Sequence, residues 1–139
     1  TYTFLMIREI QLPSRIDSVD QAAIEAAEFA KSCGFGDDFV SAIDLALRES
    51  VANAVKHGHK FDESKSVDVT FTDSDEGLEV TVRDHGAGFD VDEIPYPTNP
   101  ENLLKANGRG ILCMNSFMDE VSWSNHSGGG MVVKMIKKR

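Results

Sequence analysis

The segment from Asp37 to Gly58 constrains the fold most, because its residues predict one long amphipathic helix with two distinct faces. Acidic residues stand in the expected first turn, at Asp37 or Asp38, and the helix is expected to run to about His57. At about 100° per residue, one face is apolar and is assigned to the core. Its residues are Val40, Ile43, Leu47, Val51 and Ala54. This face needs a second layer of structure that buries it.

A second row on the same helix is polar and follows steps of four residues: Glu49, Asn53 and His57. It lies beside Ala42 and Ala46, whose small side chains would leave room for a ligand, so the row predicts a pocket wall. Glu49 and Asn53 are one turn apart. One can orient or deprotonate a nucleophile while the other offers a carbonyl oxygen to magnesium. A solvated helix face is the alternative, and His57 is expected to cap or pack rather than to catalyse.

Five runs predict β-strands. Residues 67–73 and 78–84 alternate apolar and polar side chains around a turn at 73–77, which is typical of an antiparallel hairpin. Residues 1–12 mix apolar and polar residues in the same way, and Pro13 ends them. Residues 120–124 and 131–136, separated by a turn at 127–130, complete the set.

A first helix is predicted over residues 21–32, with Ser18 or Asp20 as its cap and Gly34 just past its end. Its apolar stripe is expected to comprise Ile24, Ala27, Phe29 and Ala30. Residues 90–107 show no sustained period and predict a long connection, followed by a short helix over 110–118. This element order predicts an α+β fold, an α/β sandwich with one mixed, mostly antiparallel sheet and helices on one face, in a single domain of residues 1–139.

Composition narrows the function classes. The net charge of −9 argues against direct nucleic-acid binding, which needs a basic surface, and leaves either a basic protein partner or plain solubility as its meaning. No run approaches the roughly 20 apolar residues of a membrane-spanning helix, so a soluble, cytoplasmic protein without membrane contact is expected. Cys33 and Cys113 are too few for a disulfide framework and form no metal-binding cluster.

Two glycine-rich segments have the chemistry of a nucleotide site. Residues 84–89, DHGAGF, follow a strand directly, so Asp84 could accept a hydrogen bond from an adenine amino group while the glycines admit a flat ring. Residues 107–110, NGRG, precede a helix, so backbone amides and Arg109 could cradle phosphates. Each segment alone is equally consistent with an ordinary turn, and no Walker loop is present.

Taken together, three segments resemble the N, G1 and G2 boxes of the ATPase superfamily that unites gyrase, histidine kinases and MutL-type repair proteins. They are residues 49–53, ESVAN, residues 84–89, and residues 108–110, GRG. Within that superfamily, residues 110–121, GILCMNSFMDEV, and a compact lid are similar to the bacterial anti-sigma factor serine kinases. The order and spacing of the segments carry the resemblance, which covers nearly the whole chain.

The resemblance implies a role for each matching residue. Glu49 would be the general base on a substrate serine, Asn53 the magnesium ligand, and Asp84 the residue that holds adenine. The other implied nucleotide-binding residues are His57, Gly86, Gly88, Phe89, Gly108, Arg109, Gly110 and Ile111.

The implied function is an anti-sigma factor with serine-protein kinase activity. It would bind Mg²⁺ and ATP, sequester a sigma factor and phosphorylate a serine of an anti-sigma antagonist protein, and the resemblance also allows a homodimer. A nonenzymatic ATP-dependent binding module and the catalytic domain of a histidine kinase are the alternatives. Residues 128–131, GGGM, depart from the family, which more often has hydroxyl residues after this glycine. A phosphate contact is expected to be missing there, which would slow transfer without abolishing ATP binding.

Overall fold

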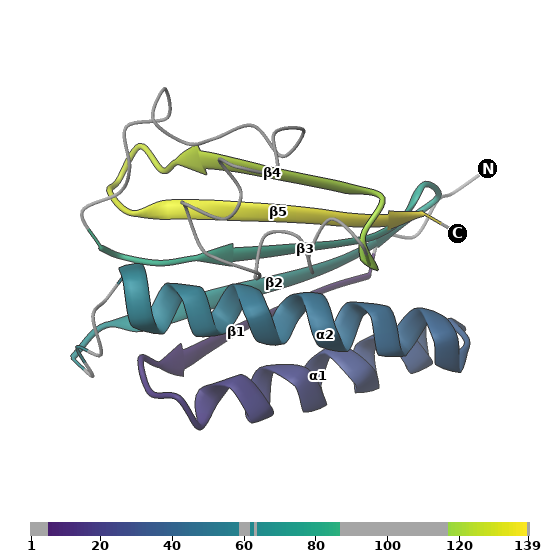
Figure 1. The fold of residues 1–139 in the computed structure, drawn as a ribbon. Coiled ribbons are helices and arrows are strands. Elements are labelled where there is room, and N and C mark those ends of the chain that lie inside the picture. Colours follow the sequence, from purple (N-terminus) through teal and green to yellow (C-terminus); the bar gives the residue numbers. More distant parts are fainter. Residues whose placement is uncertain (1–5, 59–61, 63, 87–116, 139) are drawn as a thin grey trace, which may run out of the picture.

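The computed structural model describes residues 6–58, 62, 64–86 and 117–138 of the chain. The elements, in order, are β1 (Met6–Pro13), α1 (Ser18–Ser32), α2 (Asp37–Asn53), η1 (Ala54–Gly58), β2 (Ser66–Ser74), β3 (Gly77–Arg83), β4 (Glu120–Asn125) and β5 (Met131–Lys138). Figure 1 shows α1 and α2 side by side, covering one face of the sheet. This arrangement confirms the predicted α+β sandwich with helices on one face.

The strands form one five-stranded sheet in the order β1-β2-β3-β5-β4. All the described pairings are antiparallel, so the parallel pairing of a mixed sheet does not occur among these strands. The hairpin predicted around residues 73–77 is the β2–β3 hairpin, with Ser74 opposite Gly77. β3 and β5 are neighbours although β4 lies between them in sequence, and their register places Arg83 opposite Val132.

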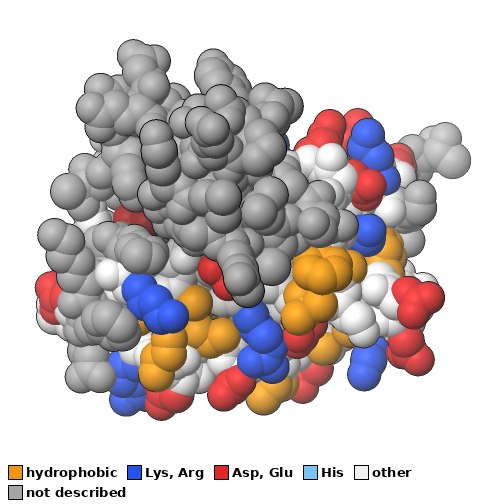
Figure 2. Space-filling view, viewed as in Figure 1, with side chains coloured by type: hydrophobic (Ala, Val, Ile, Leu, Met, Phe, Trp, Pro, Cys, Tyr) orange, Lys and Arg blue, Asp and Glu red, His pale blue; other side chains and the backbone are white. Residues whose placement is uncertain are grey.

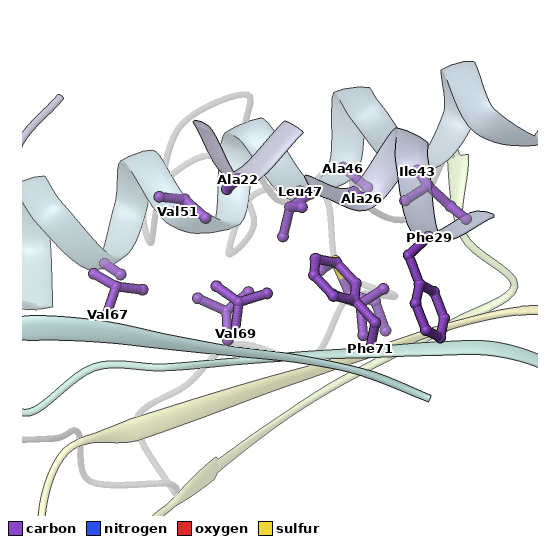
Figure 3. Close-up of a cluster of buried hydrophobic side chains, with 14 of the residues drawn as sticks. Ala22, Ala26, Phe29, Ile43, Ala46, Leu47, Val51, Val67, Val69 and Phe71 are labelled. Atoms are coloured by element: carbon purple, nitrogen blue, oxygen red, sulfur yellow. The ribbon is translucent and has the colours of Figure 1, made fainter. Parts of the chain in front are cut away.

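The core lies between the helices and the sheet (Figure 3). Ile43, Leu47 and Val51 of α2 face Val67, Val69 and Phe71 of β2 across this layer. All of these side chains are at most 1% exposed, and the predicted core face of α2 is therefore confirmed.

Two sequence predictions about small and apolar side chains were wrong. Ala46 is fully buried in the core cluster, so it packs against protein rather than leaving room for a ligand. Ile24 is 51% exposed, because the buried face of α1 is built mainly from alanines one position away from the predicted stripe. The buried residues of α1 are Ser18, Ala22, Ala23, Ala26, Phe29 and Ala30. The small residues let α1 lie close to α2, a contact that aliphatic periodicity alone does not reveal.

The two ends of α1 differ in their hydrogen bonds. At its C-terminus the Phe35 amide donates to the Ala30 carbonyl and the Gly34 amide to the Lys31 carbonyl, with Gly34 at φ 87°, as in a Schellman motif. The predicted glycine stop is thus correct. The predicted cap is not, because α1 begins at Ser18 and the Ser18 hydroxyl donates to the Pro13 carbonyl at 2.7 Å.

α2 does not continue as an α-helix to His57. It changes at Ala54 into the π-helical turn η1, which ends at Gly58. A π-helical turn widens the backbone spiral, and such turns are frequent at functional sites. Asn53 is therefore the last residue of α2 before the helix widens.

On the face shown in Figure 2, acidic and basic side chains are interspersed with orange apolar ones over the described helices. No basic cluster dominates the described part of this face. No described helix combines the length and apolar composition needed to cross a bilayer.

Candidate functional site

The predicted site residues that the structure describes lie at one end of the molecule, where three elements meet. Figure 1 shows the C-terminal end of α2, the end of β3 and the β4–β5 turn on the same side, at the left of the view. Asn53 ends α2, and Asp84 follows the last residue of β3. α2 also lies against β3 and β5, with the Ser50 hydroxyl 3.2 Å from the Met135 sulfur. The fold therefore assembles the two separate sequence segments at a common edge.

Asp84 is a buried carboxylate, 7% exposed, that is held by backbone amides. Its Oδ1 accepts hydrogen bonds from the Gly86 amide at 2.9 Å and the Met131 amide at 3.2 Å. Its own amide donates to the Met131 carbonyl at 2.9 Å. Among the described residues no donor bonds to Oδ2, which leaves that oxygen as an acceptor for a ligand.

The Met131 contact is a part of the site that the sequence did not predict. Residues 84 and 131 are far apart in the chain, and they meet because β3 pairs with β5 rather than with its sequence neighbour β4. Local periodicity cannot reveal a pairing between non-consecutive strands. A hint was the position of Asp84 immediately after a strand and of Met131 at the start of another.

His85 is tied to β2. Its Nε2 lies 2.8 Å from Oδ2 of Asp68, and both side chains are only partly exposed. This contact anchors the turn after Asp84 to the second strand of the sheet. Asp68 was not among the predicted site residues, because its position on the outer row of a half-buried strand is that of an ordinary surface residue.

Glu49 and Asn53, in the last two turns of α2, are half-buried polar side chains without described ionic or hydrogen-bond partners for their key groups. Asn53 is half-buried, and its Nδ2 is buried without a hydrogen-bond partner in the described part of the structure. Glu49 is half-buried and forms no ion pair with a described residue. An unpaired buried amide costs about 1–3 kcal/mol, so its presence favours a ligand that satisfies it.

The cation next to Glu49 in sequence is directed elsewhere. Arg48 pairs with Asp20 of α1 at 2.6 Å and with Asp44 of α2 at 3.0 Å. The hydrogen bond to Asp20, then that to Asp44, raises the pKa of Arg48 above its ordinary value. Arg48 thus links the two helices and does not neutralise Glu49.

No three His, Cys, Asp or Glu side chains gather into a metal site within the described ranges. A cation here would therefore depend on the amide oxygen of Asn53, with phosphate and water oxygens completing the shell, which is how proteins commonly hold Mg²⁺. Rotation of the Asn53 side-chain amide by about 180° exchanges its oxygen and nitrogen. The position of the unpaired Nδ2 could therefore be taken by the oxygen, which fits the role of a cation ligand.

The remaining predicted residues lie outside the described part of the chain. They are Gly88, Phe89, Gly108, Arg109, Gly110 and Ile111, and the side chain of His57. Residues 90–107, predicted as a long connection, and most of residues 110–118, predicted as a short helix, lie there as well. Their assigned roles stay predictions.

A separate cavity of about 680 Å³ lies along the strands. Asp68, Thr70, Thr81 and Arg83 line it, and they alternate with the core residues of β2 and β3, so it opens on the face away from the helices. Among the predicted site residues that the structure describes, Glu49, Asn53, Asp84 and Gly86, none lines it.

Comparison with known proteins identifies the class to which this fold and site belong. The chain belongs to the histidine kinase-like ATPase domain family, whose family model matches residues 12–137. The matched range includes both the end of α2 and the Asp84 segment. The predicted superfamily is confirmed.

Among curated proteins, the chain is similar to serine-protein kinases named RsbW. That of Bacillus subtilis (strain 168) is 32% identical over 135 residues, which cover 93% of this chain and 83% of the relative. That of Oceanobacillus iheyensis is 27% identical over 135 residues, covering 93% and 84%. The predicted relationship to the bacterial serine kinases of this superfamily is thereby confirmed.

A solved structure has the same fold. The crystal structure of the RsbU and RsbW domains of Rv1364c from Mycobacterium tuberculosis matches with a TM-score of 0.70 at 18% identity. The match covers 96% of this chain, which spans only 32% of that longer chain. This likeness concerns the fold.

Proposed function

We propose that this chain is a serine-protein kinase that uses ATP. The family and the names of its relatives support this function. The observation that carries it is Asn53, whose amide is buried without a described partner one helical turn after Glu49, a carboxylate that pairs with no described cation. A solvated helix face would leave the Asn53 amide in water, whereas a nucleotide site would use it.

Three described residues would hold the nucleotide. Oδ2 of Asp84 would accept a hydrogen bond from the 6-amino group of adenine, because Oδ1 is engaged by backbone amides. The amide oxygen of Asn53 would bind Mg²⁺, which, when present, neutralises charge on the transferring phosphate. Gly86, whose amide fixes Asp84, would shape the turn beneath the base. The glycines at 88, 108 and 110 with Phe89, Arg109 and Ile111 would complete the pocket.

Glu49 would act on the protein substrate. As the serine oxygen attacks the γ-phosphorus, Glu49 would accept the hydroxyl proton, while the bond to the β,γ-bridging oxygen breaks and ADP leaves. A carboxylate does this best when no neighbouring cation holds its charge. Glu49 meets that condition, because the guanidinium of its sequence neighbour Arg48 is bound to Asp20 and Asp44.

We further propose that the kinase regulates transcription by exchanging partners. It would sequester a sigma factor and release it when an anti-sigma antagonist, whose serine it phosphorylates, competes for binding. The acidic charge of −9 suits a partner with a basic surface. Since a sigma factor acts with RNA polymerase, the site of action would be the cytoplasm. A single domain over residues 1–139 and a homodimer are parts of the same proposal.

Phosphoryl transfer to a candidate antagonist from γ-labelled ATP tests the kinase function. Glu49→Gln should retain Mg²⁺-dependent ATP binding and lose labelled phosphoserine. Glu28→Gln, on the 64% exposed Glu28 of α1, is the matched control and should keep full transfer. ATP binding without any phosphoserine in the native protein would instead favour the nonenzymatic binding module.

Partner exchange needs its own measurement. Affinity capture of the tagged protein from its native cell, with and without ATP, should recover a sigma factor, and adding the unphosphorylated antagonist should displace it. Capture of no sigma factor under either condition would refute the anti-sigma role while leaving the kinase reaction intact.

A further inference from the structure

The β4–β5 turn, residues 126–130, meets the backbone of Asp84 at a distance that only glycine permits. Gly130 is buried and has φ +84°, a conformation that other residues rarely adopt. A Cβ at this position would overlap the Asp84 carbonyl oxygen and lie 2.7 Å from the Asp84 carbonyl carbon and 3.0 Å from the His85 Cα. All of these are backbone atoms that cannot rotate away. The turn and the Asp84 segment are therefore in direct backbone contact.

This contact allows the hydrogen bonds that orient the carboxylate. With Gly130 against Asp84, the next residue, Met131, exchanges two hydrogen bonds with Asp84, one through each of its backbone groups. The Met131 amide and the Gly86 amide converge on Oδ1. Two donors on one oxygen oppose rotation of the side chain, since turning it would break both bonds in a buried setting.

We propose that Gly130 is a positioning residue that, with the Met131 amide, directs Oδ2 of Asp84 at the base and so sets the preference for adenine. The proposal rests on the nucleotide site described above. A carboxylate oxygen accepts hydrogen bonds only, so a 6-amino group satisfies it, whereas a 6-oxo group or a bare hydrogen does not. The turn would thus determine specificity without contacting the nucleotide.

The contact also gives residues 128–130 a role that differs from the predicted loss of a phosphate contact. Gly128 and Gly129 are exposed, and their amides bind His126, to Nδ1 and to the carbonyl oxygen respectively. Gly130 alone of the three would place a Cβ against the Asp84 backbone. The requirement for glycine at position 130 is therefore specific to Asp84.

Gly129 supplies a matched control. It has φ +101°, so alanine there is strained by the backbone as at Gly130, but no atom lies within 4 Å of its would-be Cβ. Gly130→Ala and Gly129→Ala thus share the conformational cost and differ in the collision with Asp84. Thermal unfolding of both variants identifies any loss of folding before nucleotide binding is compared.

The experiment measures dissociation constants for ATP and for purine riboside triphosphate, which is ATP without its 6-amino group. The native protein and Gly129→Ala should prefer ATP by roughly 10- to 100-fold, the range for one hydrogen bond to a charged group. Gly130→Ala should lose most of this preference. Equal weakening of both nucleotides by Gly130→Ala, or an unchanged preference, would overturn the positioning role, because a purely structural defect lowers both affinities together.

Asp84→Asn keeps the test decisive if Gly130→Ala does not fold. With its oxygen still bound to the two backbone amides, the substituted side chain would turn its NH₂ group to the base and favour inosine triphosphate, whose 6-oxo group accepts a hydrogen bond. A retained preference for ATP would mean that the side chain turns over freely and would overturn the proposal. A native protein that binds no purine nucleotide would instead refute the proposed function.

Discussion

Asn53→Ala should make the nucleotide-free protein more stable while removing its response to Mg²⁺ and ATP. The Nδ2 of Asn53 is buried without a described partner, and such a group costs about 1–3 kcal/mol. Alanine removes it and adds up to about 0.7 kcal/mol of helix propensity. Lost packing around the half-buried side chain offsets part of the gain, which leaves about 1–2 kcal/mol.

Thermal unfolding of the native protein and of Asn53→Ala, each with and without Mg²⁺ and ATP, measures both the change in stability and the response to ligand. For a chain of 139 residues this gain corresponds to a rise in Tm of roughly 3–8 °C without ligand. In the native protein, Mg²⁺ and ATP at a hundred times the dissociation constant should add about 2.7 kcal/mol of stability, and Asn53→Ala should lose most of that increment.

Ser41→Ala, at an exposed position of the same helix, is the control for helix propensity and should change the unfolding free energy by about 0.5 kcal/mol or less. A fall in Tm for ligand-free Asn53→Ala would mean that the amide is satisfied in the folded protein. An undiminished response to Mg²⁺ and ATP would mean that Asn53 does not hold the metal. Either result would refute the reasoning that assigns this residue to the site.

Three further perturbations probe the framework. Phe71→Ala should lower the unfolding free energy in urea by about 3–5 kcal/mol, because Phe71 is fully buried, whereas Ile24→Ala at a 51% exposed position should cost about 0.5 kcal/mol or less. Equal losses would contradict the assignment of the core. Arg48→Gln should lower the unfolding free energy by less than about 1 kcal/mol, because the Arg48 side chain is 39% exposed. This loss should become smaller in about 1 M NaCl, which screens the ion pairs. A larger loss that does not depend on salt would show that packing dominates. Asp68→Ala should cost about 0.5–1.5 kcal/mol and weaken ATP binding severalfold, because it frees His85 from β2, and titration calorimetry showing native affinity would exclude this anchoring role.

Local patterns predicted the elements that depend on local physics. The β2–β3 hairpin follows from alternation around a turn, the end of α1 from a glycine at positive φ, and the core face of α2 from helical periodicity. The predictions for Ile24 and Ala46 were wrong because burial of a small residue depends on how closely two helices approach. The periodicity of a sequence indicates which face of a helix is apolar, but not how closely that helix approaches its neighbour.

In the candidate site, too, some features follow from the local sequence and others depend on tertiary contacts. Asp84 could be selected because its segment stands in order with residues 49–53 and 108–110, but its orientation depends on Met131, across a pairing between non-consecutive strands. Asn53 could be selected from its spacing to Glu49, whereas the absence of a described partner for its amide is visible only once the surrounding residues are placed. The sequence therefore selected the candidate residues, and the tertiary contacts define how their side chains are held.

Asp84 and Asn53 represent opposite solutions to placing a polar group at a buried edge. Asp84 has its Oδ1 fully occupied by backbone donors, so its remaining acceptor has one direction and suits recognition of a rigid base. Asn53 has a buried amide that no described residue satisfies, at the point where α2 widens into η1, and under the proposed function a bound ligand would supply its partner. Under the proposed function, the first arrangement would cost little stability and give selectivity for the base. The second would lower the stability of the ligand-free protein and couple its folding free energy to the ligand. On this reasoning, base preference and metal dependence should be separable by mutation, with changes at the β4–β5 turn altering the first and changes at the end of α2 the second.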